Sequence, residues 1–289
     1  MNELAKRTIV GVIGVPLVLL IIYLGSWYYF IAFAFLFSVG LWEFGRLANI
    51  KGYHPLTILN IISGLSILFS IYLIFTFSYV TQNVGSIFIA MIQQILILFA
   101  ILFTANLFRN NGNSIANISA TFGGLVYLLI PFSSLIILRF FYNYLFSMGI
   151  TNTTNWAYYL FVFFATIWIC DSAAYFIGKK WGKHKIAPKV SPKKSWEGGI
   201  AGLVSAVLSF WLLGLAFKID LPISILLLDG LIIGIFGQIG DFVESSFKRD
   251  ADVKDSGKLF WEHGGVLDRF DSIMFSAPVL LLVLIIYFL

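Results

Sequence analysis

The chain has 289 residues, of which 60% are hydrophobic, 18% aromatic and only 11% charged. Soluble domains carry about 25% charged residues, so this composition excludes a soluble globule and a disordered chain, and the single cysteine excludes a disulfide scaffold. The mean hydropathy of +0.93 indicates an integral membrane protein that crosses the bilayer many times.

A spanning helix needs roughly 20 mostly apolar residues, and several stretches of the chain meet this requirement. They cover residues 8–24, 28–45, 57–77, 86–106, 119–138, 157–177, 199–217, 224–245 and 272–289. The first follows Lys6 and Arg7 as in a signal peptide, but it lacks a convincing small-residue cleavage site, so we interpret it as a retained helix. The sequence therefore predicts an all-α polytopic membrane protein with about nine transmembrane helices.

The distribution of Lys and Arg predicts the orientation, because these residues concentrate in cytoplasmic loops. With nine spans, 17 of the 19 Lys and Arg residues fall on the side of the amino terminus, and only Arg139 and Lys218 fall on the other side. We therefore expect a cytoplasmic amino terminus in a multi-pass protein of the cell (plasma or inner) membrane. This topology also explains the excess of Lys, so no nucleic-acid partner is expected.

Most charged residues lie in two polar islands, residues 171–198 and 241–271, which together hold 22 of the 33 charges. Both islands fall on the predicted cytoplasmic side; the first has a net charge of +5 and the second of −3. We predict a transmembrane scaffold of about five helices over residues 1–156. A catalytic region with two cytoplasmic polar loops is expected over residues 157–289.

The first island combines an intramembrane carboxylate with a run of lysines. Asp171 lies within the sixth span, where a charge costs at least about 2.5 kcal/mol unless it meets water or a partner, which favours a functional role over a structural hydrogen bond. Lys193, Lys194 and Ser195 precede the seventh span, and cations with a hydroxyl at a helix amino terminus are typical of a phosphate site. The alternative for the lysines is contact with anionic lipid headgroups.

The eighth span carries a glycine stripe. On a regular helix, one arc of about 80° contains Gly230, Gly234, Gly237, Asp241, Glu244 and Lys248. Small residues on one face let helices pack closely in lipid, so we expect the two carboxylates to extend this face into the interior. The alternative is an exposed pair at the membrane surface. Asp229 lies just before the stripe and receives no predicted role.

The second island places Asp268 and Asp271 in the first turn of the last span, where they share a face. They suit a helix cap, and with the carboxylates of the eighth span they also suit a hard cation such as Mg²⁺. Basic residues beside such a metal would hold a polyphosphate. His263 and Asp268 also match the H-x₄-D motif of glycerolipid acyltransferases, but that motif belongs to a globular domain that this sequence lacks.

A longer pattern covers the second island. The chain reads Ser245-x-Phe247-Lys248-Arg249-x₄-Lys254-Asp255-x-Gly257-x₂-Phe260-x₂-His263-Gly264-Gly265-Val266-x-Asp268-Arg269-Phe270-Asp271. This pattern closely resembles the signature of the phosphatidate cytidylyltransferases, also called CDP-diacylglycerol synthases. The resemblance covers roughly residues 165–289, and one departure is Trp261, where the family usually has Pro or Gly.

The resemblance implies that CMP is transferred from CTP to phosphatidate, giving CDP-diacylglycerol and pyrophosphate. The implied partners are CTP, phosphatidate and membrane lipids, and glycine-rich helices leave room for a homodimer. The implied cofactor is Mg²⁺, with a second metal ion allowed, and the implied metal ligands are Asp241, Asp268, Asp271 and Glu244. Catalytic roles are implied for Asp241, Asp268, Lys254, Arg249 and His263. Contacts to substrate phosphate are implied for Lys193, Lys194, Ser195, Lys248, Arg269 and Asp171.

Two other functions are considered beside this one. A CTP-dependent polyprenol or phytol kinase would transfer the γ-phosphate and release CDP. An anion transporter would carry inverted repeats and polar groups near the midplane, whereas the polar islands here lie on one predicted side.

Overall fold

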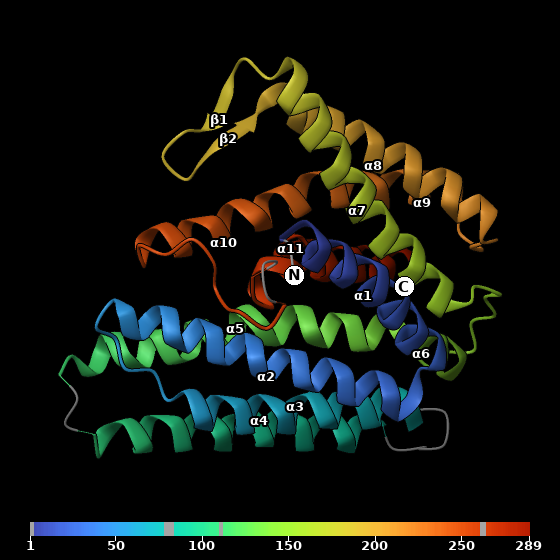
Figure 1. The fold of residues 1–289 in the computed structure, drawn as a ribbon. Coiled ribbons are helices and arrows are strands. Elements are labelled where there is room, and N and C mark those ends of the chain that lie inside the picture. Colours follow the sequence, from blue (N-terminus) through green and yellow to red (C-terminus); the bar gives the residue numbers. More distant parts are fainter. Residues whose placement is uncertain (1–2, 78–83, 110–111, 261–263) are drawn as a thin grey trace. The chain divides into compact units, whose positions relative to one another are not determined.

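The computed structural model describes residues 3–77, 84–109, 112–260 and 264–289 (Figure 1). The amino-terminal helices are α1 (Glu3–Leu24), α2 (Ser26–Ile50), α3 (Thr57–Phe77), α4 (Val84–Leu107), α5 (Ser114–Arg139) and α6 (Phe141–Ser147). They are followed by α7 (Trp156–Trp181), strands β1 (Lys185–Ala187) and β2 (Ser191–Ser195), α8 (Trp196–Ala216), α9 (Ile223–Ile232), the π-helical turn η1 (Ile233–Gly237), α10 (Gln238–Asp250) and α11 (Leu267–Phe288).

Eight helical stretches within the described residues are long and apolar enough to cross a membrane. They are Ser26–Ile50, Thr57–Thr76, Ile89–Leu107, Ser114–Arg139, Trp156–Trp181, Trp196–Ala216, Ile223–Asp250 and Leu267–Phe288, and a shorter apolar helix covers Val12–Leu24. Every predicted span therefore coincides with a helix, and the predicted all-α polytopic membrane fold is confirmed. The number of crossings and their orientation stay predictions.

The chain divides into two compact units. Unit 1 contains Met1–Ile150 and Asp250–Arg269, and unit 2 contains Thr151–Arg249 and Phe270–Leu289. Residues 250–269, from the second polar island, thus group with the amino-terminal helices. The predicted division into a scaffold and a catalytic region is one of function and stays a prediction.

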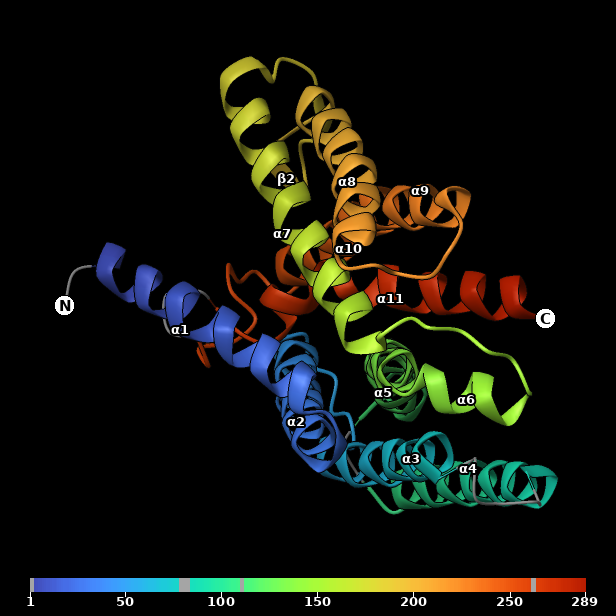
Figure 2. The same cartoon turned by 90° about the vertical axis from the view of Figure 1, so that its right-hand side faces the viewer.

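In unit 1 the helices α2, α3, α4 and α5 run alongside one another (Figures 1 and 2). Tyr29, Phe33 and Phe37 follow one another at four-residue spacing on α2, so all three face the same way, and each is at most 1% exposed. The Tyr29 hydroxyl donates to the Leu135 carbonyl oxygen at 2.9 Å, which fixes α2 against α5. This aromatic face forms the core of the unit.

In unit 2 the helices α7 and α8 lie side by side and are joined by the β1–β2 hairpin (Figure 2). The helices approach closely because glycines face the contact: a Cβ on Gly198 would lie 2.7 Å from the Ala174 carbonyl oxygen. The antiparallel hairpin pairs Lys185 with Ser195. It was not predicted, although Pro188 stands at the second position of its turn, where proline is favoured.

The eighth predicted span is not one regular α-helix, because the π-turn η1 separates α9 from α10. A π-turn holds more residues than an α-turn, so it changes the face on which every later residue lies. Gly230 and Gly234 contact α8, each with a Cβ position 2.6 Å from an α8 atom, whereas Gly240 contacts the Asp271 carbonyl oxygen of α11. Close packing at glycines is confirmed, but the single continuous arc is wrong because it assumed a regular helix.

Candidate active site

The two polar islands meet in unit 2 through an ion pair between Lys194 of β2 and Asp241 of α10. The Lys194 ammonium also lies 4.3 Å from the centre of the Phe242 ring, and the Ser245 hydroxyl donates to Asp241 Oδ1 at 3.3 Å. The Lys194 and Asp241 side chains are 29% and 30% exposed. A predicted phosphate-binding cation and a predicted metal ligand are therefore in contact and reachable from solvent.

Glu244 lies one turn beyond Asp241 on α10 and is only 1% exposed. Its Oε2 accepts an ion-pair contact from Lys248 Nζ at 2.7 Å, one turn further along the same helix. The prediction that Glu244 points into the interior is confirmed. Lys248 balances the charge of Glu244. This ion pair would have to open for Glu244 to bind a metal ion, or for Lys248 to contact a phosphate, as the sequence predicts.

Two further carboxylates belong to this cluster. Asp271, near the start of α11, lies within electrostatic range of Asp241, Asp171 and Glu244. Its Oδ1 accepts a hydrogen bond from its neighbour Ser272 N at 2.6 Å. Asp171, in the second half of α7, is exposed. Three helices of unit 2 thus place Asp241, Glu244 and Asp171 within electrostatic range of Asp271.

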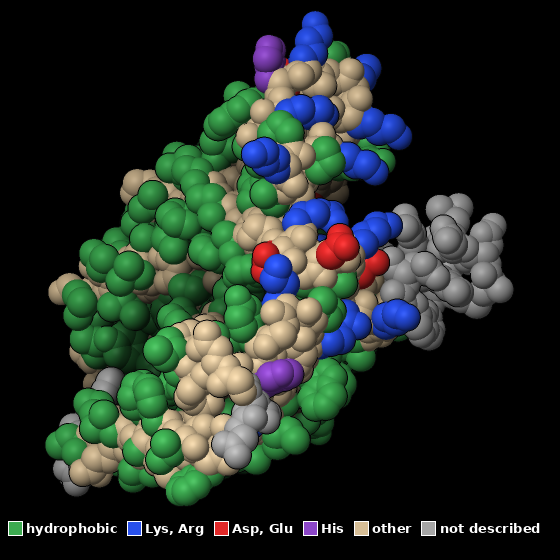
Figure 3. All heavy atoms as spheres, turned by 90° about the vertical axis from the view of Figure 1, so that its left-hand side faces the viewer, with side chains coloured by type: hydrophobic (Ala, Val, Ile, Leu, Met, Phe, Trp, Pro, Cys, Tyr) green, Lys and Arg blue, Asp and Glu red, His purple; other side chains and the backbone are tan. Residues whose placement is uncertain are grey.

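The first island adds exposed lysines to unit 2, and Lys and Arg side chains gather over this end of the unit in Figure 3. Lys193 is exposed on β2, and Arg249 Nε donates to the Val190 carbonyl oxygen in the hairpin turn at 3.4 Å. Ser195, in contrast, is 2% exposed and its hydroxyl accepts from Gly198 N at 3.3 Å, as the amino-terminal cap of α8. The structure therefore gives Ser195 a capping role, and its contact to phosphate stays a prediction.

In unit 1, Asp268 organises the start of α11. Its Oδ2 accepts hydrogen bonds from Ser256 N at 2.8 Å, Ser256 Oγ at 2.8 Å and Gly265 N at 2.7 Å. Gly264 has a φ of +80°, and a Cβ there would meet the Asp268 carboxylate, so this turn requires glycine. These donors precede α11 and do not belong to its first turn, so the interpretation of Asp268 as a cap and its role as a metal ligand both stay predictions.

The same segment is held by a residue that the sequence did not identify as functional. Glu43 of α2 is 4% exposed and accepts hydrogen bonds from Val266 N and Leu267 N, both at 3.0 Å, and from Ser256 Oγ at 3.1 Å. Arg46 lies one turn along α2 and donates to the Asp255 and Ser256 carbonyl oxygens. The signal for Glu43 was present, since a lone carboxylate in an apolar helix is rarely without a role.

Two further predicted residues of the second island, Lys254 and Arg269, are exposed in unit 1. His263 and the unusual Trp261 lie outside the described residues. The predictions that Lys254 and Arg269 bind phosphate, and that His263 orients or donates, therefore stay predictions.

Asp229 also has a partner now. The Tyr159 hydroxyl donates to Asp229 Oδ2 at 2.8 Å, and both side chains are fully buried between α7 and α9 in unit 2. The other carboxylate oxygen, Oδ1, has no hydrogen-bond partner among the residues that the structure describes. The pair joins two helices of the unit, which is a structural role that the sequence did not indicate.

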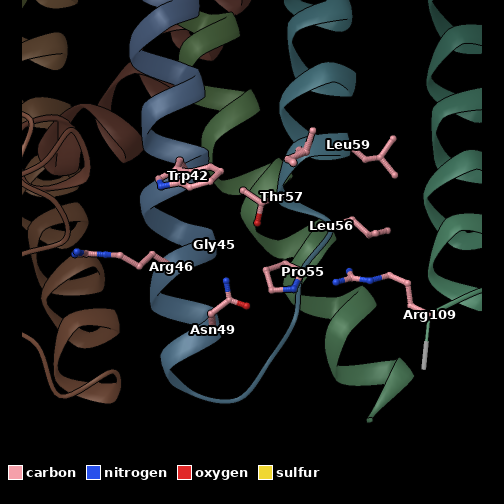
Figure 4. A pocket seen from close by; sticks show the side chains of 10 residues that line it. Trp42, Gly45, Arg46, Asn49, Pro55, Leu56, Thr57, Leu59 and Arg109 are labelled. Carbon is pink, nitrogen blue, oxygen red and sulfur yellow. The ribbon is translucent and has the colours of Figure 1, made fainter. Parts of the chain in front are cut away.

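Unit 1 contains an open pocket of about 530 Å³ (Figure 4). It is lined by Trp42, Gly45, Arg46, Asn49, Pro55, Leu56, Thr57, Ile58, Leu59 and Arg109. Arg109, beyond the end of α4, points toward the other lining residues, whereas the Arg46 side chain on α2 points away from them (Figure 4). None of the predicted site residues lines this pocket.

The donor chemistry of the carboxylate cluster fits a hard cation. Within the described residues, no group of three or more His, Cys, Asp or Glu side chains forms a complete metal cage. Mg²⁺ does not need one, because it is usually bound through one or two carboxylates and shares its other positions with water and substrate phosphates. Asp241 and Asp271 in unit 2 supply such carboxylates.

Comparison with known proteins agrees with the signature in the second island. The model of the family described as "Cytidylyltransferase family" matches residues 5–287. A "Phosphatidate cytidylyltransferase" from Bacillus subtilis (strain 168) is 32% identical over 288 residues, which cover 99% of this chain and 100% of the relative. Proteins of the same name from Staphylococcus haemolyticus (strain JCSC1435) and Staphylococcus aureus (strain COL) are each 45% identical, over 44% of this chain and 49% of theirs.

Proposed function

The chain belongs to the cytidylyltransferase family, and we propose that it transfers CMP from CTP to phosphatidate, giving CDP-diacylglycerol and pyrophosphate. The observation that carries this proposal is the match to the Bacillus subtilis relative over that protein's whole length. The dense signature at residues 245–271 supports it. The kinase and transporter alternatives are not favoured, because the whole chain aligns with a nucleotidyltransferase family.

Both substrates are anionic, so the protein must bring two negative phosphates together. We propose that Lys193, Lys194 and Arg249 of unit 2 hold the phosphates of CTP. Lys194 pairs with Asp241, and a nucleotide phosphate would compete with Asp241 as its anionic partner. In unit 1, the exposed Lys254 and Arg269 are further candidates for phosphate contacts.

The transfer itself needs little covalent help from the protein. A phosphate oxygen of phosphatidate attacks the α-phosphorus of CTP in line, and the bond from that phosphorus to the departing pyrophosphate breaks. The attacking phosphate is already ionised at neutral pH, so no strong general base is required. Catalysis then consists mainly of positioning and charge neutralisation, which the cations of the first island supply.

We propose Asp241 and Asp271 as the residues of unit 2 that hold Mg²⁺. The ion would neutralise charge on the polyphosphate. The sequence-based expectation that Asp268 shares this metal, and that a second metal ion binds, stays a proposal, because Asp268 belongs to the other unit. We further propose a cell-membrane location with the site on the cytoplasmic side, contacts with membrane lipids, and a homodimer.

The test is incubation of the purified protein with labelled CTP, Mg²⁺ and phosphatidate, followed by chromatography of the lipids. The proposed function predicts a lipid that carries the label of the cytidine ring, together with free pyrophosphate. Lipid phosphate with free CDP would identify a kinase instead. Phosphate entry into sealed vesicles without any CTP turnover would identify a transporter, and either result would overturn the proposal.

A further inference from the structure

We propose that Glu43 is a positioning residue of this transfer reaction, which fixes the loop residues 255–257 and 264–267 and thereby orients Asp268. The proposal rests on the proposed function, since it concerns the same site. All the contacts that carry it lie within unit 1. Glu43 is not part of the sequence signature, which covers residues 245–271.

The Glu43 carboxylate collects donors from two separate parts of the loop. A carboxylate is an acceptor only, with two oxygens. Here Oε1 accepts from Val266 N, and Oε2 accepts from Leu267 N and Ser256 Oγ. Val266 and Leu267 stand at the start of α11, where backbone N–H groups lack partners within their own helix. Glu43 therefore caps α11 from another helix and ties Ser256 to the same point.

One hydroxyl connects Glu43 with Asp268. Ser256 Oγ lies 3.1 Å from Glu43 Oε2 and 2.8 Å from Asp268 Oδ2, and it has a single proton to share between them. Asp268 Oδ2 also accepts from Ser256 N and Gly265 N. A change at residue 43 thus reaches Asp268 through one intervening side chain and through the backbone that follows it.

The loop is shaped around this carboxylate. A Cβ added at Gly257 or at Gly265 would collide with Glu43 Oε1. Both positions are glycines of the signature, and their lack of a side chain is what lets the backbone approach the carboxylate so closely. On its other side the loop is held by Arg46, which donates to the carbonyl oxygens of Asp255 and Ser256. Two charged side chains of α2 therefore hold one short loop.

Burial of the Glu43 carboxylate in α2 costs free energy that its hydrogen bonds must offset. A carboxylate in an apolar spanning helix is expensive, and residues of this kind usually mark functional sites in membrane proteins. Replacing a group that orients a ligand or catalytic side chain typically lowers activity or metal affinity roughly 10- to 100-fold. Glu43 meets this description, since it touches the residues that hold Asp268 and not the reacting atoms.

The experiment compares Glu43→Gln with Thr121→Val in the full-length protein. Glutamine keeps the shape but places an NH₂ donor against the donors of the loop. Thr121 is a matched control, because it is also fully buried in unit 1 and also bonds distant backbone, accepting from Leu56 N at 3.0 Å. For each variant we would measure thermal unfolding, kcat, KM for CTP, the Mg²⁺ concentration for half-maximal activity, and hydrogen exchange at Val266 and Leu267.

We expect Glu43→Gln to fold, to lose kcat roughly 10- to 100-fold and to need more Mg²⁺, with KM for CTP changed much less. Exchange at Val266 and Leu267 should rise roughly tenfold. Thr121→Val should lose stability but keep its kcat and the protection of these amides. Combining Glu43→Gln with Ser256→Ala should cost little more than the worse single change, because both act through one network.

The proposal is overturned if Glu43→Gln keeps normal kcat and amide protection, or if its losses multiply with those of Ser256→Ala. Should Glu43→Gln not fold, Gly265→Ala disturbs the same contact from the loop side and must lower kcat. The two proposals fail separately. If the wild-type protein does not transfer CMP, the proposed function is wrong. The role of Glu43 in fixing the loop is still tested in that case, because hydrogen exchange at Val266 and Leu267 is measured without turnover.

Discussion

Replacement of Asp241 by asparagine removes one charge and keeps the side-chain shape. It therefore tests whether Asp241 contributes to CMP transfer independently of the folding stability of unit 2. Asp241 pairs with Lys194 and accepts from Ser245 Oγ at 3.3 Å. The two charged side chains are 30% and 29% exposed, and exposed ion pairs contribute only about 0–1 kcal/mol to stability. We therefore expect Asp241→Asn to lower the free energy of unfolding by less than about 1 kcal/mol.

The expected effect on turnover is much larger. The reaction gathers the charges of CTP and phosphatidate in one place, and Asp241 is proposed to hold the cation that balances them. Loss of one preorganised electrostatic contact typically lowers kcat about 100- to 1,000-fold, or about 3–4 kcal/mol in activation free energy. We expect Asp241→Asn to lose at least about 100-fold in CMP transfer while it stays folded.

The assay is transfer of labelled CMP to phosphatidate in mixed micelles, with thermal unfolding measured on the same preparation. Asp220→Asn is a matched control, because it makes the same change in unit 2 at an exposed carboxylate that accepts from Thr153 N at 3.1 Å and Thr153 Oγ1 at 2.8 Å. The control should keep its activity. The reasoning is refuted if Asp241→Asn retains kcat within about threefold of wild type, or loses activity only as it loses its fold.

Three further predictions follow from the packing and the proposed cofactor. Gly240→Ala should lower the free energy of unfolding by about 1–3 kcal/mol and reduce activity, because its Cβ would meet the Asp271 carbonyl oxygen. The control Gly123→Ala has open space around its Cβ and should be neutral or stabilising. Thermal unfolding that changes equally in the two variants would contradict this prediction. Tyr159→Phe should cost about 1–3 kcal/mol in chemical unfolding, because it leaves the buried Asp229 carboxylate without its donor, and unchanged stability would argue against the pair. Chelation with EDTA should abolish CMP transfer without unfolding the protein, and Mg²⁺ should restore it; activity that persists in EDTA would exclude the metal.

The helices and part of the candidate site could be predicted because their signals are local. Runs of about 20 apolar residues define spans wherever they occur, and Asp241 and Glu244 are one turn apart on any helix. Neither apolar runs nor helical spacing predicts the contact between Lys194 and Asp241, because this contact forms only when the hairpin brings β2 to α10. Glu43 lies 223 residues from Val266 in the sequence, so no periodicity connects the two. The π-turn also escaped prediction, because a hydrophobic pattern does not reveal one extra residue in a buried helix.

The π-turn at Ile233–Gly237 makes the site depend on backbone geometry as well as on side-chain identity. Relative to a regular helix, this turn accommodates one surplus residue, and α10 carries its carboxylates on the far side of it. If the same residues formed a regular α-helix instead, every functional side chain would still be present, yet Asp241 would be rotated by about 100° relative to α9. The orientation of the acidic cluster is thus encoded by the backbone geometry of a stretch that contains none of its members.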